Sequence, residues 1–238
     1  MLKSISETFF SLVFPVSCEL CGKLLPIRDS KGICRACENA ISLITSPHCA
    51  GCGRTVFANG ERCGHCSKEN FHFDRAYACV YYDKNMKKLL HAFKFERRRF
   101  LLPFFINTLD GFMRQYLSGI HWDLLVPVPM DGAHERERGF NQARLFSAAL
   151  AKKSGMPHAP QALGCRKTKI SQSFLKKSER KQNVEGQFFV RNRDLIASSH
   201  ILLVDDILTT GQTASACAKA LKTAGAQTVS TLALARGI

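Results

Sequence analysis

Residues Ile201 to Thr213 read ILLVDDILTTGQT, and this stretch decides the fold. Its four apolar residues, 201–204, predict a short strand that is buried on both faces of a sheet. Asp205 and Asp206 follow where that strand would reach the edge of its sheet. A loop of hydroxyl side chains around one glycine comes next. Residues 214–224 (ASACAKALKTA) are good helix formers and precede a glycine that would end the helix.

A strand, a small polar turn and a helix in this order predict a phosphate site. Backbone N–H groups at the start of a helix are unpaired and carry partial positive charge. Gly211 lets the backbone approach an anion closely, and the hydroxyls add donors. Asp205 and Asp206 would repel a phosphate but suit the hydroxyls of a ribose. We therefore expect a ribose 5-phosphate, with its phosphate held by Thr209, Thr210, Gly211, Gln212 and Thr213.

The same thirteen residues resemble the signature of type I phosphoribosyltransferases, which bind phosphoribosyl pyrophosphate (PRPP). The resemblance implies PRPP as the ligand, with Mg²⁺ held on its diphosphate and ribose hydroxyls. It also implies catalytic roles for Asp205 and Asp206, which would orient the ribose and stabilise positive charge on it. The alternative is a buried strand whose acidic residues and threonines only cap the next helix.

The net charge of +15 is concentrated in two segments. Residues 84–99 hold seven basic residues and one acidic residue, and residues 152–193 hold eleven basic residues and two acidic ones. The rest of the chain is therefore balanced. Concentrated positive charge predicts a polyanionic partner, either nucleic acid or a ligand as charged as PRPP. A solvated basic face without a partner is the alternative.

Eight of the eleven cysteines fall into four CxxC pairs. The pairs are Cys18 and Cys21, Cys34 and Cys37, Cys49 and Cys52, and Cys63 and Cys66. Four thiolates complete the tetrahedral shell of a zinc ion, so these pairs predict two closed, structural zinc sites in a double ribbon. We expect the first pair to join the second and the third to join the fourth, with an interleaved arrangement as the alternative. So many reduced thiols predict a cytoplasmic protein.

Three cysteines stand apart from these pairs. Cys79 and Cys217 lie in apolar surroundings that predict small core residues. Cys165 is followed by Arg166 and Lys167, and these charges predict a more reactive thiol.

Residues 1–17 (MLKSISETFFSLVFPVS) have too short an apolar core for a signal peptide and no small-residue cleavage site after it. Apolar residues at helical spacing predict instead an amphipathic helix packed on the body of the protein. A peripheral position at the inner face of the membrane is the alternative that this helix leaves open. The sequence contains no apolar run long enough to span a bilayer.

From residue 74 onward the pattern alternates between strands and helices. Residues 76–82 predict a strand, and Asp83 can cap the helix after it. Further elements are a helix at 100–116, a strand at 124–126, and a helix opened by Arg136 that runs to Lys153. Alternation of this length predicts an α/β fold with a mainly parallel sheet and helices on both faces. The chain would then consist of a helix over 1–17, a double zinc ribbon over 18–70 and a phosphoribosyltransferase-like domain over 74–238.

The wider pattern resembles the ComF family of competence-associated proteins, including its GntX-like branch. The residues that carry this resemblance are FPVSCELCG with the paired CxxC ribbons, PVPM, RGFNQA, Arg166, Gln172, Arg180, Asn183 and DDILTTGQT. The resemblance covers nearly all of the chain and implies a type I phosphoribosyltransferase-like fold and a role in DNA uptake during natural transformation. It also implies partners in that process, such as single-stranded DNA and a competence helicase or a membrane channel.

Residues 164–183 (GCRKTKISQSFLKKSERKQN) are polar and strongly cationic, which predicts a mobile loop that closes over a polyanion. In phosphoribosyltransferases a loop at this place covers the pyrophosphate. The residues that would contact PRPP are Arg166, Lys167, Gln172 and Arg180 from this loop, Pro127, Val128 and Pro129 from a turn that continues to Met130, and Lys94 and Arg138. The resemblance implies that this turn receives the pyrophosphate through its backbone N–H groups. A helix-surface role is the alternative for Lys94 and Arg138.

Two functions follow from these residues. One is a nucleic-acid-handling protein that keeps a PRPP site and binds single-stranded DNA through its basic stretches, where Phe93, Phe95, Phe100 and Phe174 offer rings for stacking. For this protein the resemblance implies a role in DNA uptake. A core position is the alternative for these rings, above all for Phe93. The other function is an enzyme that moves ribose 5-phosphate from PRPP to an acceptor. The sequence does not name a general base for that acceptor.

Overall fold

The structure is a computed structural model and describes residues 16–26, 31–45, 48–49, 51–57, 62–64, 66, 69–166 and 186–237. The helix predicted over residues 1–17 lies almost wholly outside the described residues. Lys167, Gln172, Phe174, Arg180 and Asn183 also lie outside them. Among the described residues, no helix is long and apolar enough to cross a membrane.

Four parallel strands form the central sheet, in the order β1-β6-β5-β2. Their bounds are β1 Arg75–Tyr81, β2 Leu124–Pro127, β5 His200–Leu208 and β6 Thr228–Arg236. A separate antiparallel hairpin joins β3, Leu163–Cys165, to β4, Phe188–Val190. The predicted α/β fold with a mainly parallel sheet is therefore confirmed.

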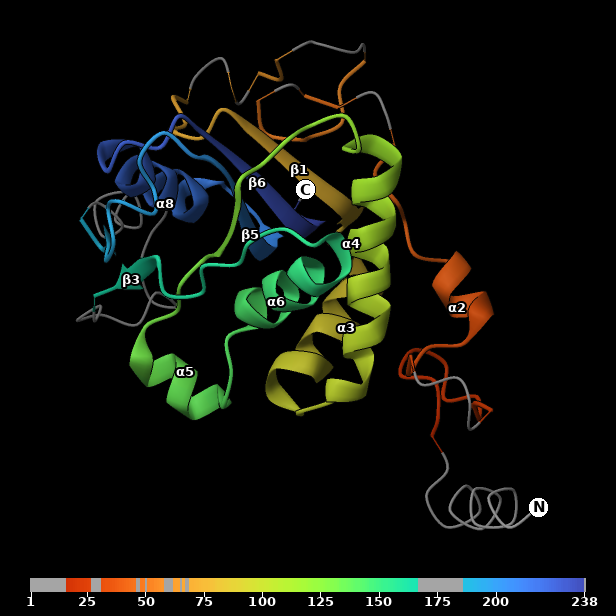
Figure 1. Ribbon diagram of the computed structural model, residues 1–238. Coiled ribbons are helices and arrows are strands. Elements are labelled where there is room, and N and C mark those ends of the chain that lie inside the picture. The colour runs from red at the N-terminus through yellow and green to blue at the C-terminus, as the bar shows by residue number, and fades with distance from the viewer. Residues whose placement is uncertain are drawn as a thin grey trace.

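Helices cover both faces of the sheet (Figure 1). One face carries α3 (Lys84–Phe95), α4 (Leu102–Tyr116) and α6 (Gln142–Ser154), and the other carries α8 (Gln212–Thr223). Strand β5 explains this division, because Leu202 and Val204 pack under α3, α4 and α6 while Ile201 and Leu203 face α8. A strand covered on both faces must be apolar at every position, as residues 201–204 are.

Two elements differ from their predicted bounds. Strand β5 continues through Asp205 and Asp206 to Leu208, because its hydrogen bonding to β6 extends to Arg236. The helix predicted from Arg136 to Lys153 is two helices, α5 (Gly132–Arg138) and α6. Gly139 separates them with a φ of 82°, a conformation that ends a helix and favours glycine.

The other helices that were predicted within the described residues are confirmed. The Asp83 side chain accepts a hydrogen bond from the Met86 N–H at 2.9 Å and so caps α3. The segment predicted as a helix over 100–116 is a 3₁₀ turn, η1 (Arg99–Leu101), followed by α4.

Both cysteine ribbons pack against this α/β body. The first contacts the corner between α3 and η1, where the Lys88 ammonium donates to the Leu20 carbonyl at 3.1 Å and Gly32 lies against the Phe100 ring. The second contacts the start of β1, where the Ala76 N–H donates to the Gly51 carbonyl at 3.0 Å. A short helix, α2 (Arg35–Asn39), belongs to the first ribbon.

The linker between the two ribbons runs along the free edge of β1. Leu43 forms an antiparallel bridge with Val80, the Ile44 N–H donates to the Cys79 carbonyl and the Tyr81 N–H donates to the Ser42 carbonyl. At the opposite edge of the sheet, Leu125 of β2 exchanges backbone hydrogen bonds with Pro157 and Ala159. Both edge strands are thus paired by backbone from outside the sheet.

Candidate functional site

A cavity of about 710 Å³ opens at the carboxyl ends of β2 and β5. In a parallel α/β sheet this edge is where ligands bind. The residues around it come from α3, the turn after β2, α5, the β3–β4 hairpin and α8. They are Lys94, Phe95, Arg97, Pro129, Met130, Asp131, His134, Glu137, Arg138, Cys165, Gln187, Phe188 and Thr213.

The two aspartates of β5 differ in their surroundings. Asp206 forms an ion pair with Lys94, a residue that lines the cavity, and both side chains are largely buried. Burial raises the pKa of Asp205 to about 8, and the neighbouring charge of Asp206 adds to this effect. The Asp206 N–H donates to the Asp205 carboxylate at 2.8 Å and opposes the shift, as does the charge of Lys94. At neutral pH a pKa of about 8 favours the protonated form of Asp205, while Asp206 is the partner of Lys94.

The loop between β5 and α8 is built as the sequence predicts. Gly211 caps α8 with a φ of 85°, and the Thr210 hydroxyl accepts from the Gln212 N–H at 3.4 Å. Thr209 and Thr213 are exposed, and Thr213 reaches the cavity. The Gln212 side chain donates to Glu69 at 3.3 Å, so it is directed to the segment that follows the second ribbon.

The turn after β2 offers fewer backbone donors than expected. Pro127 and Pro129 have no N–H, and the Val128 N–H donates to the Val204 carbonyl at 2.9 Å. The Val128 carbonyl in turn accepts from the buried Asn141 amide at 3.0 Å. A backbone donor from this turn must therefore come from Met130 or the residues after it, and contact of residues 127–129 with pyrophosphate stays a prediction.

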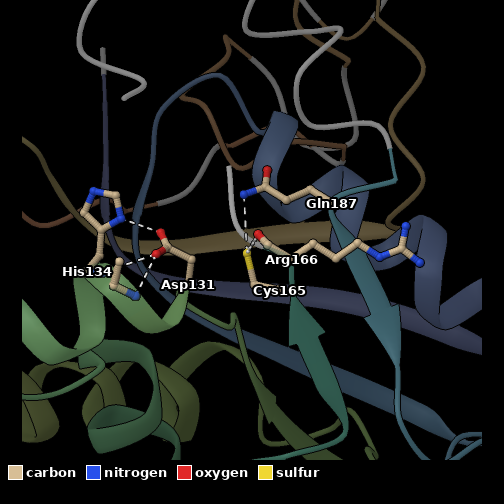
Figure 2. A network of polar contacts seen from close by, with 6 residues as sticks. Asp131, His134, Cys165, Arg166 and Gln187 are labelled. Atoms are coloured by element: carbon tan, nitrogen blue, oxygen red, sulfur yellow. Dashed lines mark hydrogen bonds and ion pairs between the residues drawn. The ribbon is translucent and has the colours of Figure 1, made fainter. Parts of the chain in front are cut away.

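Asp131 and His134 form a pair that the sequence reasoning missed (Figure 2). Asp131 caps α5 by accepting from the N–H groups of Ala133 and His134, and its second carboxylate oxygen binds the His134 ring at Nδ1. Burial raises the pKa of Asp131, but the hydrogen bonds from His134 and Ala133 outweigh it and the pKa is lowered. The available signal was the spacing D-x-x-H directly after PVPM, which places both side chains on one helical turn.

Cys165 lies across the cavity from this pair and is bound by the Gln187 amide, which donates to its sulfur at 3.3 Å (Figure 2). Burial raises the pKa of the Cys165 thiol, and the nearby charge of Asp131 adds to this, although the Gln187 hydrogen bond lowers it. The prediction of a more reactive thiol is therefore wrong, since burial outweighs the basic neighbours in sequence. Cys79 and Cys217 are buried core residues as predicted.

Basic and aromatic side chains line the opposite wall. Arg138 lies over the Phe95 ring at 5.0 Å from its centroid, and Phe95 is 62% exposed. Arg97 has a φ of 57°, a conformation that is uncommon for a residue with a side chain and clusters at functional sites. Phe93 is fully buried, so it occupies the core position that was the alternative to a stacking role.

Arg166 is placed differently from the other predicted contacts. Its guanidinium lies over the Phe189 ring at 5.7 Å, and in Figure 2 its side chain extends away from Asp131 and His134. It is not among the residues that line the cavity. Its backbone N–H donates to the Gln187 carbonyl at 2.9 Å and holds the base of the hairpin together.

The cysteines gather into two clusters in consecutive order. Cys18, Cys21, Cys34 and Cys37 form one, Cys49, Cys52, Cys63 and Cys66 form the other, and the sulfurs of each lie within 4.8 Å of one another. This grouping confirms the expected pairing and suits two tetrahedral zinc ions. Gly22 and Gly53 turn the backbone with φ of 75° and 69° directly after the second cysteine of a pair.

Backbone donors also prepare these thiols for a metal. Burial raises the pKa of Cys18 and of Cys49, but backbone N–H groups outweigh it and lower each pKa to about 6. The Cys34 N–H donates to the Cys18 sulfur at 3.4 Å, and the Cys63 N–H donates to the Cys49 sulfur at 3.3 Å. Deprotonated thiols are the form that binds zinc.

Comparison with known proteins identifies a family match for the cysteine ribbons and another for the C-terminal part of the α/β body. The double zinc ribbon domain family matches residues 9–67, and the phosphoribosyl transferase domain family matches residues 144–238. Among solved structures, a glutamine PRPP amidotransferase from B. subtilis has a TM-score of only 0.39 with this chain. The two are 19% identical, over 56% of this chain and 26% of that chain.

Whole-length relatives are similar over most of the sequence. Competence protein F of Haemophilus influenzae is 26% identical over 86% of this chain and 90% of its own. The DNA utilization protein YhgH of Salmonella typhimurium is 29% identical over 94% and 99%, and competence protein ComFC of Bacillus subtilis is 29% identical over 90% and 88%. The chain is thus a homologue of competence protein F, ComFC and YhgH, with a double zinc ribbon ahead of a phosphoribosyl transferase domain.

Proposed function

We propose that this protein binds PRPP together with Mg²⁺ at the carboxyl ends of β2 and β5 and acts in DNA uptake during natural transformation. The observation that carries the PRPP site is the convergence of three groups there. These are the paired carboxylates of β5, the Lys94 ammonium bound to Asp206, and the glycine-capped start of α8. The role in competence rests on the names of the whole-length relatives.

In this proposal each group has a separate task. The neutral Asp205 carboxyl group and the Asp206 carboxylate bind the ribose hydroxyls. The loop over Thr209–Thr213 binds the 5′-phosphate through N–H and hydroxyl donors. Lys94 and Arg138 line the cavity where the diphosphate would lie, and a bound Mg²⁺ would spread its negative charge. Contacts from Arg166, Gln172 and Arg180 stay a prediction from the sequence. Two structural zinc ions hold the ribbons, and the free thiols fit a cytoplasmic location.

Calorimetric titration of PRPP with Mg²⁺ tests the site. Wild type should bind, and Asp205→Asn/Asp206→Asn should lose most of the affinity because both ribose contacts change. Asp110→Asn is a matched control, since Asp110 also pairs with a lysine, Lys153, at 3.2 Å but away from the cavity. Normal binding by the double variant would show that the acidic pair is not the ribose site.

We further propose that single-stranded DNA binds along the basic stretch from Lys84 to Arg99. Phe95 is exposed beside Arg97 and Arg98, and bases stack on such rings while the arginines neutralise phosphates. Because Phe95 and Arg97 also line the cavity, DNA and PRPP would meet at its mouth.

Fluorescence anisotropy with a labelled oligonucleotide measures this interaction. Affinity should fall steeply with added salt. In Arg97→Ala/Arg98→Ala the slope of log K against log salt concentration should decrease by about 2, because two phosphate contacts are lost. Arg114→Ala removes an exposed charge near the end of α4 and should change neither the affinity nor the salt slope. A slope that stays the same in the double variant would exclude this stretch as the DNA contact.

A second function, transfer of ribose 5-phosphate to an acceptor, is favoured by the Asp131–His134 pair. Asp131 binds His134 at Nδ1, and in the neutral ring with its hydrogen on Nδ1 the Nε2 lone pair would accept a proton. In the reaction an acceptor nitrogen would bond to C1 of the ribose while the C1–oxygen bond breaks and its electrons leave with pyrophosphate. His134 would take the proton that the acceptor loses.

Pyrophosphate release with a panel of nucleobases and amines tests this second function. His134→Gln should lower kcat by about 10²–10⁴-fold without changing the KM for PRPP. His121→Gln is the control, because His121 also binds an aspartate, Asp123, through Nε2 at 3.0 Å, and it lines a different cavity. No release by wild type with any acceptor would count against an enzyme, and equal rates in His134→Gln would count against this base.

A further inference from the structure

Arg236, at the end of β6, is a buried arginine between the second cysteine cluster and the phosphate loop. Its side chain is almost wholly enclosed, with 2% of the residue exposed. Its Nη1 donates to the carbonyl oxygens of Leu208 and Thr209, the residues where β5 passes into the loop. Burial of a guanidinium destabilises the folded state unless its N–H groups find acceptors and its charge finds a negative partner.

The other side of this guanidinium faces the cysteines. Cys52 is a side-chain hydrogen-bond partner of the Arg236 guanidinium, and Cys63 also lies near it. In the structure Nε and Nη2 of Arg236 are buried and make no hydrogen bond with the described residues. Four thiolates around a zinc ion carry a net charge of about −2, and such a group would compensate both the charge and the free donors.

Two further contacts run between the same parts. Phe71 packs against the second cysteine cluster, and its ring lies 3.1 Å from the position that a Cβ would take on Gly211. Glu69 accepts from the Gln212 side chain at 3.3 Å. Residues that follow Cys66 in the chain thus support the glycine and the glutamine of the loop, while Arg236 supports its first threonine.

We propose that Arg236 is a positioning residue that couples the second cysteine cluster to the Thr209–Thr213 loop, so that metal in this cluster holds the loop ready for its ligand. Among the residues that the structure describes, the first cluster has no such link, because its surroundings are Leu101, Phe100 and other residues at the corner of α3 and η1. The coupling that we propose therefore concerns the second metal site. This inference rests on the proposed function for the identity of the ligand, PRPP, but not for the link between Arg236 and the metal.

Coupling of two sites is reciprocal, so it can be measured from either side. From the metal side, zinc release to a chromophoric chelator should occur in two phases, and Cys21→Ser identifies the phase of the first cluster. Arg236→Met keeps the volume of the side chain but removes its charge and donors. It should weaken zinc binding at the second cluster by about 10–100-fold, as loss of an outer partner does, and leave the first cluster unchanged.

From the ligand side, PRPP with Mg²⁺ should slow zinc release from the second cluster of wild type and not from the first. Arg236→Met should abolish this protection. Arg236→Lys, which restores charge but cannot reach both carbonyl oxygens and the thiolates at once, should recover zinc affinity in part and leave the protection lost. Cobalt-substituted protein gives a spectroscopic measure of the same effect, since thiolate–metal absorption at the second cluster should shift in Arg236→Met.

The possible outcomes separate this inference from the proposed function. If wild type does not bind PRPP, the proposed function fails, while selective weakening of the second zinc site in Arg236→Met would still support the link to the metal. Equal weakening of both clusters in a folded variant would indicate general destabilisation and overturn the inference. If Arg236→Met does not fold, wild type alone decides: equal protection of both clusters by PRPP, or protection of neither with PRPP bound, overturns it.

Discussion

The acidic pair on β5 illustrates how single residues acquire properties that their sequence neighbours do not reveal. Asp205 and Asp206 are adjacent, yet one is paired with a lysine and the other has its pKa raised to about 8 by burial and by its neighbour. The sequence identified both residues and proposed Lys94 as a ligand contact. It could not show that Lys94 binds Asp206, because this pairing depends on how α3 packs beside β5.

Asp205 should make the stability of the protein depend on pH. Its folded pKa is above the ordinary value of 3.8, so the folded state holds a proton that the unfolded state releases. This contribution to the free energy of unfolding is complete below pH 4 and is lost as the pH rises towards about 8. The free energy of unfolding of Asp205→Asn should therefore fall less between pH 5 and 8 than that of wild type. Urea denaturation at a series of pH values measures both.

Asp123→Asn provides the opposite case for the same measurement. The His200 N–H, together with His121, lowers the pKa of Asp123, so its contribution is present at neutral pH and is lost on acidification. Relative to wild type, Asp123→Asn should thus lose stability at neutral pH and little at pH 3.

The Asp205 prediction has a clear contrary outcome. If the free energy of unfolding changed with pH equally in Asp205→Asn and in wild type, Asp205 would be ionised in the folded protein.

At the scale of elements, the apolar strand and the polar turn could be predicted from the sequence, because the conformation of each depends on its own residues. Leu202 and its neighbours predict a strand covered on both faces, and Gly211 predicts a turn with positive φ. The break between α5 and α6 was missed, since a glycine within a helical pattern is often tolerated. Only the structure shows that Gly139 adopts a left-handed conformation there.

Gly211 is predicted to be the least replaceable residue of the loop. Alanine at a φ of 85° should cost about 1–2 kcal/mol in backbone strain, and its Cβ would press on the Phe71 ring at 3.1 Å. We expect Gly211→Ala to lower the free energy of unfolding by at least that amount and to weaken PRPP binding. Gly119→Ala, which meets no atom within 4 Å and needs no positive φ, is the control for both measurements.

At the scale of the whole molecule, the cysteine spacing predicted two metal sites and their consecutive grouping. It could not predict where the ribbons would lie, because no sequence pattern encodes contacts such as Gly51 with Ala76 or Leu20 with Lys88. The same limit explains why Arg236 escaped notice: its partners, Leu208 and Cys52, come from different parts of the chain.

Removal of zinc should affect the two ribbons before the α/β body. Small ribbons have little core of their own, and metal binding supplies most of their folding energy. We expect a strong chelator to lower the Tm of the protein, and amide hydrogen exchange to increase first over residues 31–57 and only later over β5 and β6. Added zinc should reverse both changes. Simultaneous exchange over the whole chain would mean that the ribbons and the body unfold as one unit.

The linker of residues 42–44 between the ribbons has a wider consequence. It pairs with β1, whose outer side would otherwise present a row of unpaired N–H and C=O groups to other chains. Its position depends on the ribbon at each of its ends. Loss of zinc would therefore uncover a strand on which a second molecule can add, and metal-starved protein should aggregate through this strand while its α/β body is still folded.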